Sequence, residues 1–369
     1  MRINKNHLNI LFRPANVGIK MLFIYALGFY NKELLGEYAS ISSLIAISVT
    51  LVGLEYYMVV QRDKALSSYF TYVAQFALVV SICLLSVFVL LDFDITVLLL
   101  LSEYLALEVI RYLNRHRLHS FSTLLQISKS SLWMLWIILT IDLVALNDIL
   151  IIWTVSNLMC ILVFVLVERH KLGFSFVKPK LFFTTIYKAK SILLSTVSNK
   201  LLNLVDRLSL PHLIPVSSFG EYFLFISFPF SIWIVIELVL QSYVYPGLLE
   251  NKKTNVHLRY IFALISIVLL ITIIFSQIMD YFFDISSDWI GICVLFLLAI
   301  AVVLNGVLSF FLYQKHIENL NSIINFGFTG LYIIILLLMA NPSLFELLGL
   351  YLFIMISCCL IKIEIVKRT

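Results

Sequence analysis

The chain has 369 residues, of which 62% are hydrophobic and 13% charged. So few charged side chains cannot cover the surface of a water-soluble protein of this length, so the composition excludes a soluble globular protein. The net charge of +5 comes from basic residues scattered over short connections, which argues against a nucleic-acid-binding surface.

Apolar runs fill the chain almost from end to end. About 20 helical residues cross a bilayer core about 30 Å thick, and each backbone amide in hydrocarbon must bond within its own segment. The runs are continuous rather than alternating, which indicates helices rather than a β-barrel. We therefore expect an all-α polytopic membrane protein of about twelve transmembrane helices, at residues 14–31, 38–60, 68–91, 95–113, 119–141, 148–167, 187–208, 219–245, 258–279, 288–313, 319–340 and 343–363.

Charged residues separate between alternate connections. Lys and Arg gather at both termini and in one set of connections, whereas the other set carries acids such as Asp92, Asp142, Asp280 and Glu346. Because basic connections stay on the cytoplasmic side, both termini are expected to be cytoplasmic. Lys20 lies inside the first run, which lacks a small-residue cleavage site, so this run is expected to be a retained helix.

The sequence carries no sign of catalytic or metal chemistry. The five cysteines lie inside apolar runs without CxxC spacing, so neither a disulfide framework nor a metal site is expected. There is no P-loop, no Gly-x-Gly-x-x-Gly after a strand and no large external loop. We expect no catalytic residues and no cofactor, and a transporter is favoured over an enzyme.

A short motif occurs twice at comparable places. Residues 35–38 read Leu-Gly-Glu-Tyr at the start of the second expected helix, and residues 219–222 read Phe-Gly-Glu-Tyr at the start of the eighth. Six spans separate them, so the two halves run in the same direction, as in parallel-repeat transporters. We predict two six-helix lobes around a central cavity: an N-terminal lobe at 1–170, a cytoplasmic linker at 171–186 and a C-terminal lobe at 187–369.

Three segments resemble a known family. Residues 35–63 (LGEYASISSLIAISVTLVGLEYYMVVQRD), 102–117 (SEYLALEVIRYLNRHR) and 199–250, which contain Asp206-Arg207 and Pro246, are similar to oligosaccharide flippases of the Wzx type. These flippases belong to the multidrug/oligosaccharidyl-lipid/polysaccharide exporter (MOP) superfamily. The motifs are loose, although the likeness in topology covers the whole chain.

The resemblance implies a function. A Wzx-type flippase moves an undecaprenyl-pyrophosphate-linked oligosaccharide from the cytoplasmic to the periplasmic leaflet of the bacterial inner membrane by alternating access, for O-antigen or related polysaccharide biosynthesis. Its implied partners are the lipid bilayer, the lipid-linked oligosaccharide, the polysaccharide polymerase and chain-length proteins. The identity of the glycan stays open.

Four basic residues are candidates for binding the pyrophosphate and sugar: Lys20, Lys129, Lys200 and Arg207. A Lys at the bilayer centre costs about 2.5–3.5 kcal/mol, so such residues are seldom without a role. The structural alternatives are snorkelling for Lys20 and pairing with a neighbouring acid for Lys200 and Arg207.

Four acids are candidate partners of these cations: Glu55, Glu103, Asp206 and Glu237. One of them could instead carry a coupling proton or take part in sodium coupling, and the sequence does not decide between these roles. The tryptophans, among them Trp153 and Trp289 near the outer ends of their helices, are interpreted as interface belt or helix packing.

Two other functions remain open. One is an ion-coupled drug/cation antiporter of the same superfamily, although that class usually carries a carboxylate in the first helix, where this chain has Lys20. The other is a non-transporting membrane component of polysaccharide assembly.

Overall fold

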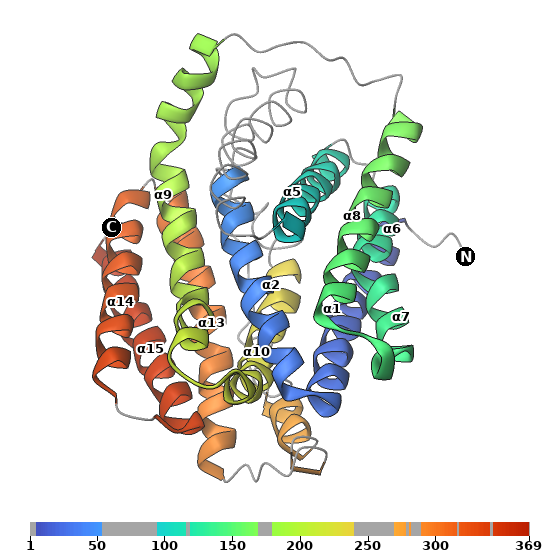
Figure 1. Ribbon diagram of the computed structural model, residues 1–369. Coiled ribbons are helices and arrows are strands. Elements are labelled where there is room, and N and C mark those ends of the chain that lie inside the picture. Colours follow the sequence, from blue (N-terminus) through green and yellow to red (C-terminus); the bar gives the residue numbers. More distant parts are fainter. Residues whose placement is uncertain are drawn as a thin grey trace. The chain divides into compact units, whose positions relative to one another are not determined.

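The computed structural model describes residues 5–53, 94–115, 119–168, 179–239, 269–277, 280–281, 289–315, 317–339 and 342–368, and these residues are nearly all helical. Figure 1 shows the helices in chain order. They are α1 (Lys5–Tyr30), α2 (Lys32–Gly53), α5 (Asp94–Arg115), α6 (His119–Ile127), the π-helix η1 (Ser128–Leu132), α7 (Trp133–Leu139), the 3-10 helix η2 (Ile141–Leu143), α8 (Leu146–Glu168), α9 (Pro179–Ser209), the 3-10 helix η3 (Leu210–His212), α10 (Val216–Val239), α13 (Trp289–Gln314), α14 (Glu318–Leu338) and α15 (Leu344–Arg368).

Most helix bounds lie within a few residues of the expected runs. The largest difference among the described helices is at the start of α1, at Lys5 rather than residue 14. Helix α9 also begins early, at Pro179 rather than residue 187, because proline suits the first turn of a helix and the polar residues after it are compatible with helix. The run expected at 68–91 lies outside the described residues, so the count of twelve stays a prediction.

Five of the described helices are long and apolar enough to cross a membrane. They are Leu146–Val167, Val216–Ile236, Ile290–Leu312, Glu318–Leu338 and Leu344–Arg368. Helix α14 shows how such a helix faces its surroundings: Asn321, Asn325 and Thr329 are buried, whereas Ile334 and Leu337 are exposed. This inverted pattern is typical of a helix with lipid outside and protein inside. The chain is a multi-pass membrane protein.

Contacts divide the chain into two compact units. One consists of Met1–Phe23 and Glu37–Leu204, and the other of Ile24–Gly36 and Val205–Thr369. In the first unit, α5, α6 and α8 enclose a core of six buried residues, which are Ala106, Val109, Leu113, Leu125, Cys160 and Phe164. In the second, α13 packs against α10, α14 and α15.

The two copies of the repeated motif meet inside the second unit. Gly36 lies four residues after the first residue of α2 (Lys32), and Gly220 lies four residues after the first residue of α10 (Val216). A Cβ on Gly36 would meet the carbonyl oxygen of Val216, and one on Gly220 would meet the carbonyl oxygen of Lys32. The contact is therefore reciprocal, as expected for two copies of one structural unit, and both positions require glycine.

Two further interactions support this crossing. The side chain of Asn31, the one residue between α1 and α2, accepts backbone N–H groups of Glu33 (2.9 Å) and Leu34 (3.1 Å) and so caps α2. The ammonium of Lys32 lies 2.5 Å from the carboxylate of Glu221, which follows the second motif glycine. Cap, ion pair and glycine contact together hold the start of α2 against α10.

Replacing either motif glycine should destabilise the protein. In Gly36→Ala and Gly220→Ala the new methyl group meets backbone rather than a flexible side chain, so we expect a loss of about 1–3 kcal/mol from overpacking. Thermal unfolding of the detergent-purified protein measures the loss. Gly327→Ala in α14 is the matched control, since no atom lies within 4 Å of its added Cβ, and it should be neutral or slightly stabilising. Equal melting temperatures for all three variants would contradict the close contact.

Candidate functional site

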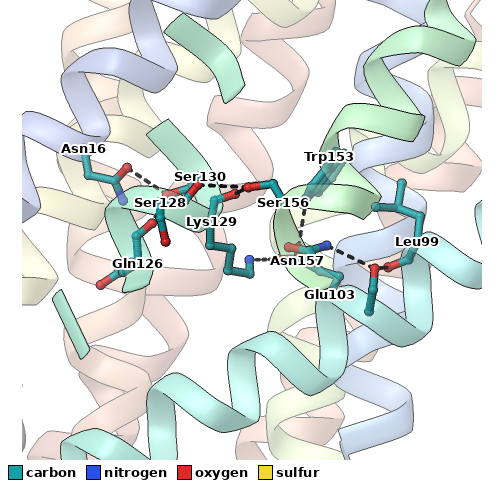
Figure 2. Close-up of polar contacts among 11 residues, drawn as sticks. Asn16, Leu99, Glu103, Gln126, Ser128, Lys129, Ser130, Trp153, Ser156 and Asn157 are labelled. Carbon is teal, nitrogen blue, oxygen red and sulfur yellow. Dashed lines mark hydrogen bonds and ion pairs between the residues drawn. The ribbon is translucent and has the colours of Figure 1, made fainter. Parts of the chain in front are cut away.

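A buried ion pair lies within the first unit. Lys129 is ten residues from either end of the segment His119–Leu139, which places it near mid-depth of that segment. Its ammonium lies 2.5 Å from Oε1 of Glu103 on α5, and both side chains are buried, with 7% and 12% of their surfaces accessible. Figure 2 shows the pair among the polar residues around it. Because both charges are largely removed from water, the Coulomb attraction between them is stronger than in a surface ion pair, and it offsets the cost of burying the two charges.

Trp153 on α8 holds the other carboxylate oxygen. Its indole Nε1 donates to Oε2 of Glu103 at 2.9 Å (Figure 2). The indole ring also stacks on Trp133, with 5.8 Å between ring centroids, and lies 6.1 Å from the ring of Tyr38. Trp153 therefore packs against aromatic rings of other helices, as the helix-packing interpretation expects, and its N–H donates to the Glu103 carboxylate inside the unit.

The helix that carries Lys129 is locally a π-helix. Residues Ser128–Leu132 form one π-turn between α6 and α7. A π-turn disturbs the regular hydrogen-bond ladder, and such turns are frequent at functional sites. The hydroxyl of Ser156 on α8 donates to the carbonyl oxygens of Ser128 (2.9 Å) and Lys129 (3.1 Å). Backbone groups in the turn are thereby satisfied without water, as a membrane interior demands.

Helix α1 approaches the same turn. The Oδ1 atom of Asn16 accepts the hydroxyl of Ser130 at 2.8 Å and also the hydroxyl of Ser131. Lys20 follows Asn16 by one helical turn and is exposed, and its ammonium interacts electrostatically with both Lys129 and Glu103. The structure thus brings together Lys20, Lys129 and Glu103. We call these three residues the charge cluster, and with both lysines and the carboxylate ionised its net charge is +1.

Known proteins were compared with the chain as a whole. No protein-family model matches it, and no curated protein does. Two solved structures align over almost its full length. A MATE crystallised in complex with Br-NRF has a TM-score of 0.55 and 12% identity, over 97% of this chain and 94% of that chain. A multidrug resistance MATE family transporter of the MOP superfamily, in an outward-facing conformation, has a TM-score of 0.53 and 12% identity, over 98% of this chain and 96% of that chain.

The chain has the MATE transporter fold. An identity of 12% shows the fold alone, and a fold does not specify a substrate. The second neighbour belongs to the MOP superfamily, which also contains the flippases that the sequence resembles.

The remaining cations lie outside the charge cluster. Lys200 on α9 belongs to the first unit and is exposed, and it forms no ion pair with any residue that the structure describes. Arg207 belongs to the second unit and is nearly buried. Its Nε lies 3.7 Å from Oδ1 of Asp206, and its Cζ lies 4.0 Å from the ring centroid of Phe230. Arg207 thus has the surroundings of a structural ion pair.

The candidate acids also differ in their surroundings. Asp206 is fully buried and accepts the Tyr222 hydroxyl at 2.7 Å. Tyr222 belongs to the second repeat motif, just as Tyr38 belongs to the first and interacts electrostatically with Glu103. Each motif tyrosine therefore lies beside a buried carboxylate. Glu55 lies outside the described residues, and Glu237 lies in α10, with a side chain of which the structure gives no description.

Sequence reasoning overlooked a second buried lysine. Lys362 was counted with the basic cytoplasmic end, yet its side chain is fully buried within α15. Its ammonium donates to Asn305 Oδ1 at 2.7 Å and to Ser309 Oγ at 2.9 Å, both on α13. The signal was present in the sequence: Asn305 and Ser309 are one helical turn apart in an otherwise apolar run. These neutral oxygens replace water around the ammonium.

Loss of one partner of the Lys129–Glu103 pair should lower the free energy of unfolding as expected for a buried ion pair. Lys129→Ala leaves the Glu103 carboxylate buried without its cation, so we expect a loss of about 3–5 kcal/mol. The double variant Glu103→Gln/Lys129→Met removes both charges at similar volume and should recover most of that loss. Thermal unfolding in detergent measures both.

A matched pair in the same chain provides the control. Lys32 and Glu221 are also 2.5 Å apart, but about a third of each side chain is accessible. Lys32→Ala should therefore cost only about 0.2–1 kcal/mol. A loss for Lys129→Ala as small as that for Lys32→Ala would mean that water screens the Lys129–Glu103 pair.

Proposed function

We propose that this chain is a flippase that translocates an undecaprenyl-pyrophosphate-linked oligosaccharide from the cytoplasmic to the periplasmic leaflet by alternating access. The observation that carries the proposal is a cluster of two lysines and one glutamate, in which Lys129 lies at the middle of the segment His119–Leu139. A diphosphate must lose its water on entering the bilayer, and ammonium groups at that depth replace the lost solvation. The MATE transporter fold supports a transport role.

The sign of the cluster decides which cargo it favours. With all three groups ionised, Lys20 and Lys129 contribute two positive charges and Glu103 contributes one negative charge. A site that must hold a cation without water needs an excess of negative charge, whereas this cluster has an excess of positive charge. An anionic cargo is therefore favoured, and a lipid-linked diphosphate is an anion that such a transporter meets within the bilayer.

The second candidate is a drug/cation antiporter, and two observations favour it. One of the structural neighbours is a multidrug resistance transporter. In addition, Glu103 lies beside Trp153 and Tyr38, and a carboxylate with aromatic rings suits an organic cation. Release of Lys129 from Glu103 would be needed before that carboxylate could bind a cation. The third candidate, a non-transporting membrane component, accounts for the buried charges only as contacts between helices.

The proposal extends to the rest of the path. Two parallel lobes, at 1–170 and 187–369, would enclose the cavity, with Lys200 and Arg207 as further cationic contacts for phosphate or sugar. Both termini would be cytoplasmic in the bacterial inner membrane. The polysaccharide polymerase and chain-length proteins would act on the delivered cargo, in O-antigen or related polysaccharide biosynthesis.

Flipping should depend on the charge of Lys129. In proteoliposomes loaded with a fluorescent undecaprenyl-pyrophosphate-linked oligosaccharide, Lys129→Ala should reduce translocation to the rate of protein-free vesicles. Lys129→Arg should keep part of the activity, because it keeps the charge but not the shape. Lys200→Ala should also impair flipping if Lys200 lines the path.

Lys190→Ala is the control for a cation lost elsewhere, since Lys190 is exposed on α9 and lies 4.2 Å from the ring centroid of Tyr187; it should flip at the wild-type rate. Wild-type rates in the folded Lys129→Ala variant, or translocation of an organic cation instead of the lipid-linked glycan by the wild type, would refute the proposal.

A further inference from the structure

The ammonium of Lys129 is already occupied. Glu103 binds it at 2.5 Å, and Trp153 fixes the other oxygen of the same carboxylate. Only 7% of the Lys129 side chain is accessible. The ammonium has three N–H donors, but a phosphate oxygen bound beside the ionised carboxylate would place two anions in one buried site, where each disfavours the charge of the other. Cargo and Glu103 must therefore compete for Lys129.

We propose that Lys129 exchanges the carboxylate of Glu103 for a phosphate oxygen of the cargo, and that Glu103 takes up one proton in the exchange. This proposal rests on the proposed function and adds its regulation. The ion pair between the Lys129 ammonium and Glu103 Oε1 breaks, and the ammonium donates to the phosphate oxygen. The proton comes from water and forms the O–H bond of a neutral Glu103 carboxyl group.

The charges balance only if the proton is included. With Glu103 ionised, the charge cluster has a net charge of +1; with Glu103 protonated, it has two positive charges. A diphosphate esterified at both ends carries one negative charge on each phosphate, so the protonated cluster and the cargo neutralise each other. Without the proton, the buried site would hold a net negative charge, which is costly at membrane depth.

The groups around Glu103 come from several elements. Lys129 on η1 and Trp153 on α8 bind it directly. Lys20 on α1 interacts electrostatically with it, as do Tyr38 on α2 and Cys160 on α8. In the described part of the chain, these surroundings contain two cations and no second carboxylate close to Glu103. Once Lys129 turns to the cargo, Lys20 is the cation that remains beside Glu103 among the described residues.

The exchange gives the pH dependence of binding a definite sign. Proton and anionic cargo favour each other, so binding should strengthen as the pH falls, by at most about tenfold per pH unit for one proton. For an organic cation the sign is opposite, since the proton and the cation compete for the same carboxylate. The pH dependence therefore separates a flippase with this exchange from a drug/cation antiporter.

The test is equilibrium binding of an undecaprenyl-pyrophosphate-linked oligosaccharide to the purified protein between about pH 5 and about pH 8, a range above the ordinary pKa of a glutamate and below that of a lysine. The wild type should bind more tightly at the acidic end. Glu103→Gln, which mimics the neutral carboxyl group, should bind about tenfold or more tightly than the wild type at the alkaline end, and its affinity should not change with pH. Glu221→Gln is the matched control, because it removes the acid of the exposed Lys32–Glu221 pair; it should retain the wild-type pH dependence.

The outcomes are distinct. Binding that is equally strong at every pH, or weaker binding by Glu103→Gln, would overturn the exchange while leaving the flippase assignment in place. Loss of the pH dependence in Glu221→Gln would assign the proton to another site and also overturn it. If neither the wild type nor Glu103→Gln binds the lipid-linked oligosaccharide at any pH, the flippase assignment is wrong and the exchange falls with it.

Discussion

The cost of holding a lysine ammonium inside a membrane protein governs the organisation of the first unit. Glu103 neutralises Lys129, Trp153 orients Glu103, and Ser156 satisfies the carbonyl oxygens of the π-turn that carries Lys129. Each of these contacts joins two different helices. Because an uncompensated charge at this depth would be expensive, the helices α5 and α8 and the segment His119–Leu139 are held together around one ion pair.

Lipid as the outer solvent explains the rest of the architecture. Helix α14 buries Asn321, Asn325 and Thr329 and exposes Ile334 and Leu337, which reverses the arrangement of a soluble helix. Interior polar groups then join the helices by hydrogen bonds. One example is Lys362 on α15, whose ammonium donates to Asn305 and Ser309 on α13. Close backbone approach at Gly36 and Gly220 serves the same purpose beside the Lys32–Glu221 ion pair.

Much of this could be predicted from residues near one another in the chain. Continuous hydrophobicity predicts the bounds of helix α8 to within two residues at its start and one at its end. The reason is that most residues of a helix surrounded by lipid must be apolar, so the apolar run ends where the helix ends. The repeated motif correctly marks equivalent positions in α2 and α10. The motif alone did not explain why it contains glycine. Only the structure shows that the carbonyl oxygens of Val216 and Lys32 leave no room for a Cβ on Gly36 and Gly220. The candidate lysines were chosen from their positions within apolar runs, and such a position cannot distinguish the buried Lys129 from the exposed Lys200.

The sequence by itself determined a polytopic helical membrane protein, its repeat and the presence of charge at membrane depth, because these depend on composition and on local periodicity. The tertiary structure decided which charges meet. Glu103 is 26 residues from Lys129 and 50 from Trp153, so no local pattern selects it from the four candidate acids. Side chains from three helices converge on one carboxylate only when the helices pack, and that packing gives Trp153 its hydrogen bond to Glu103.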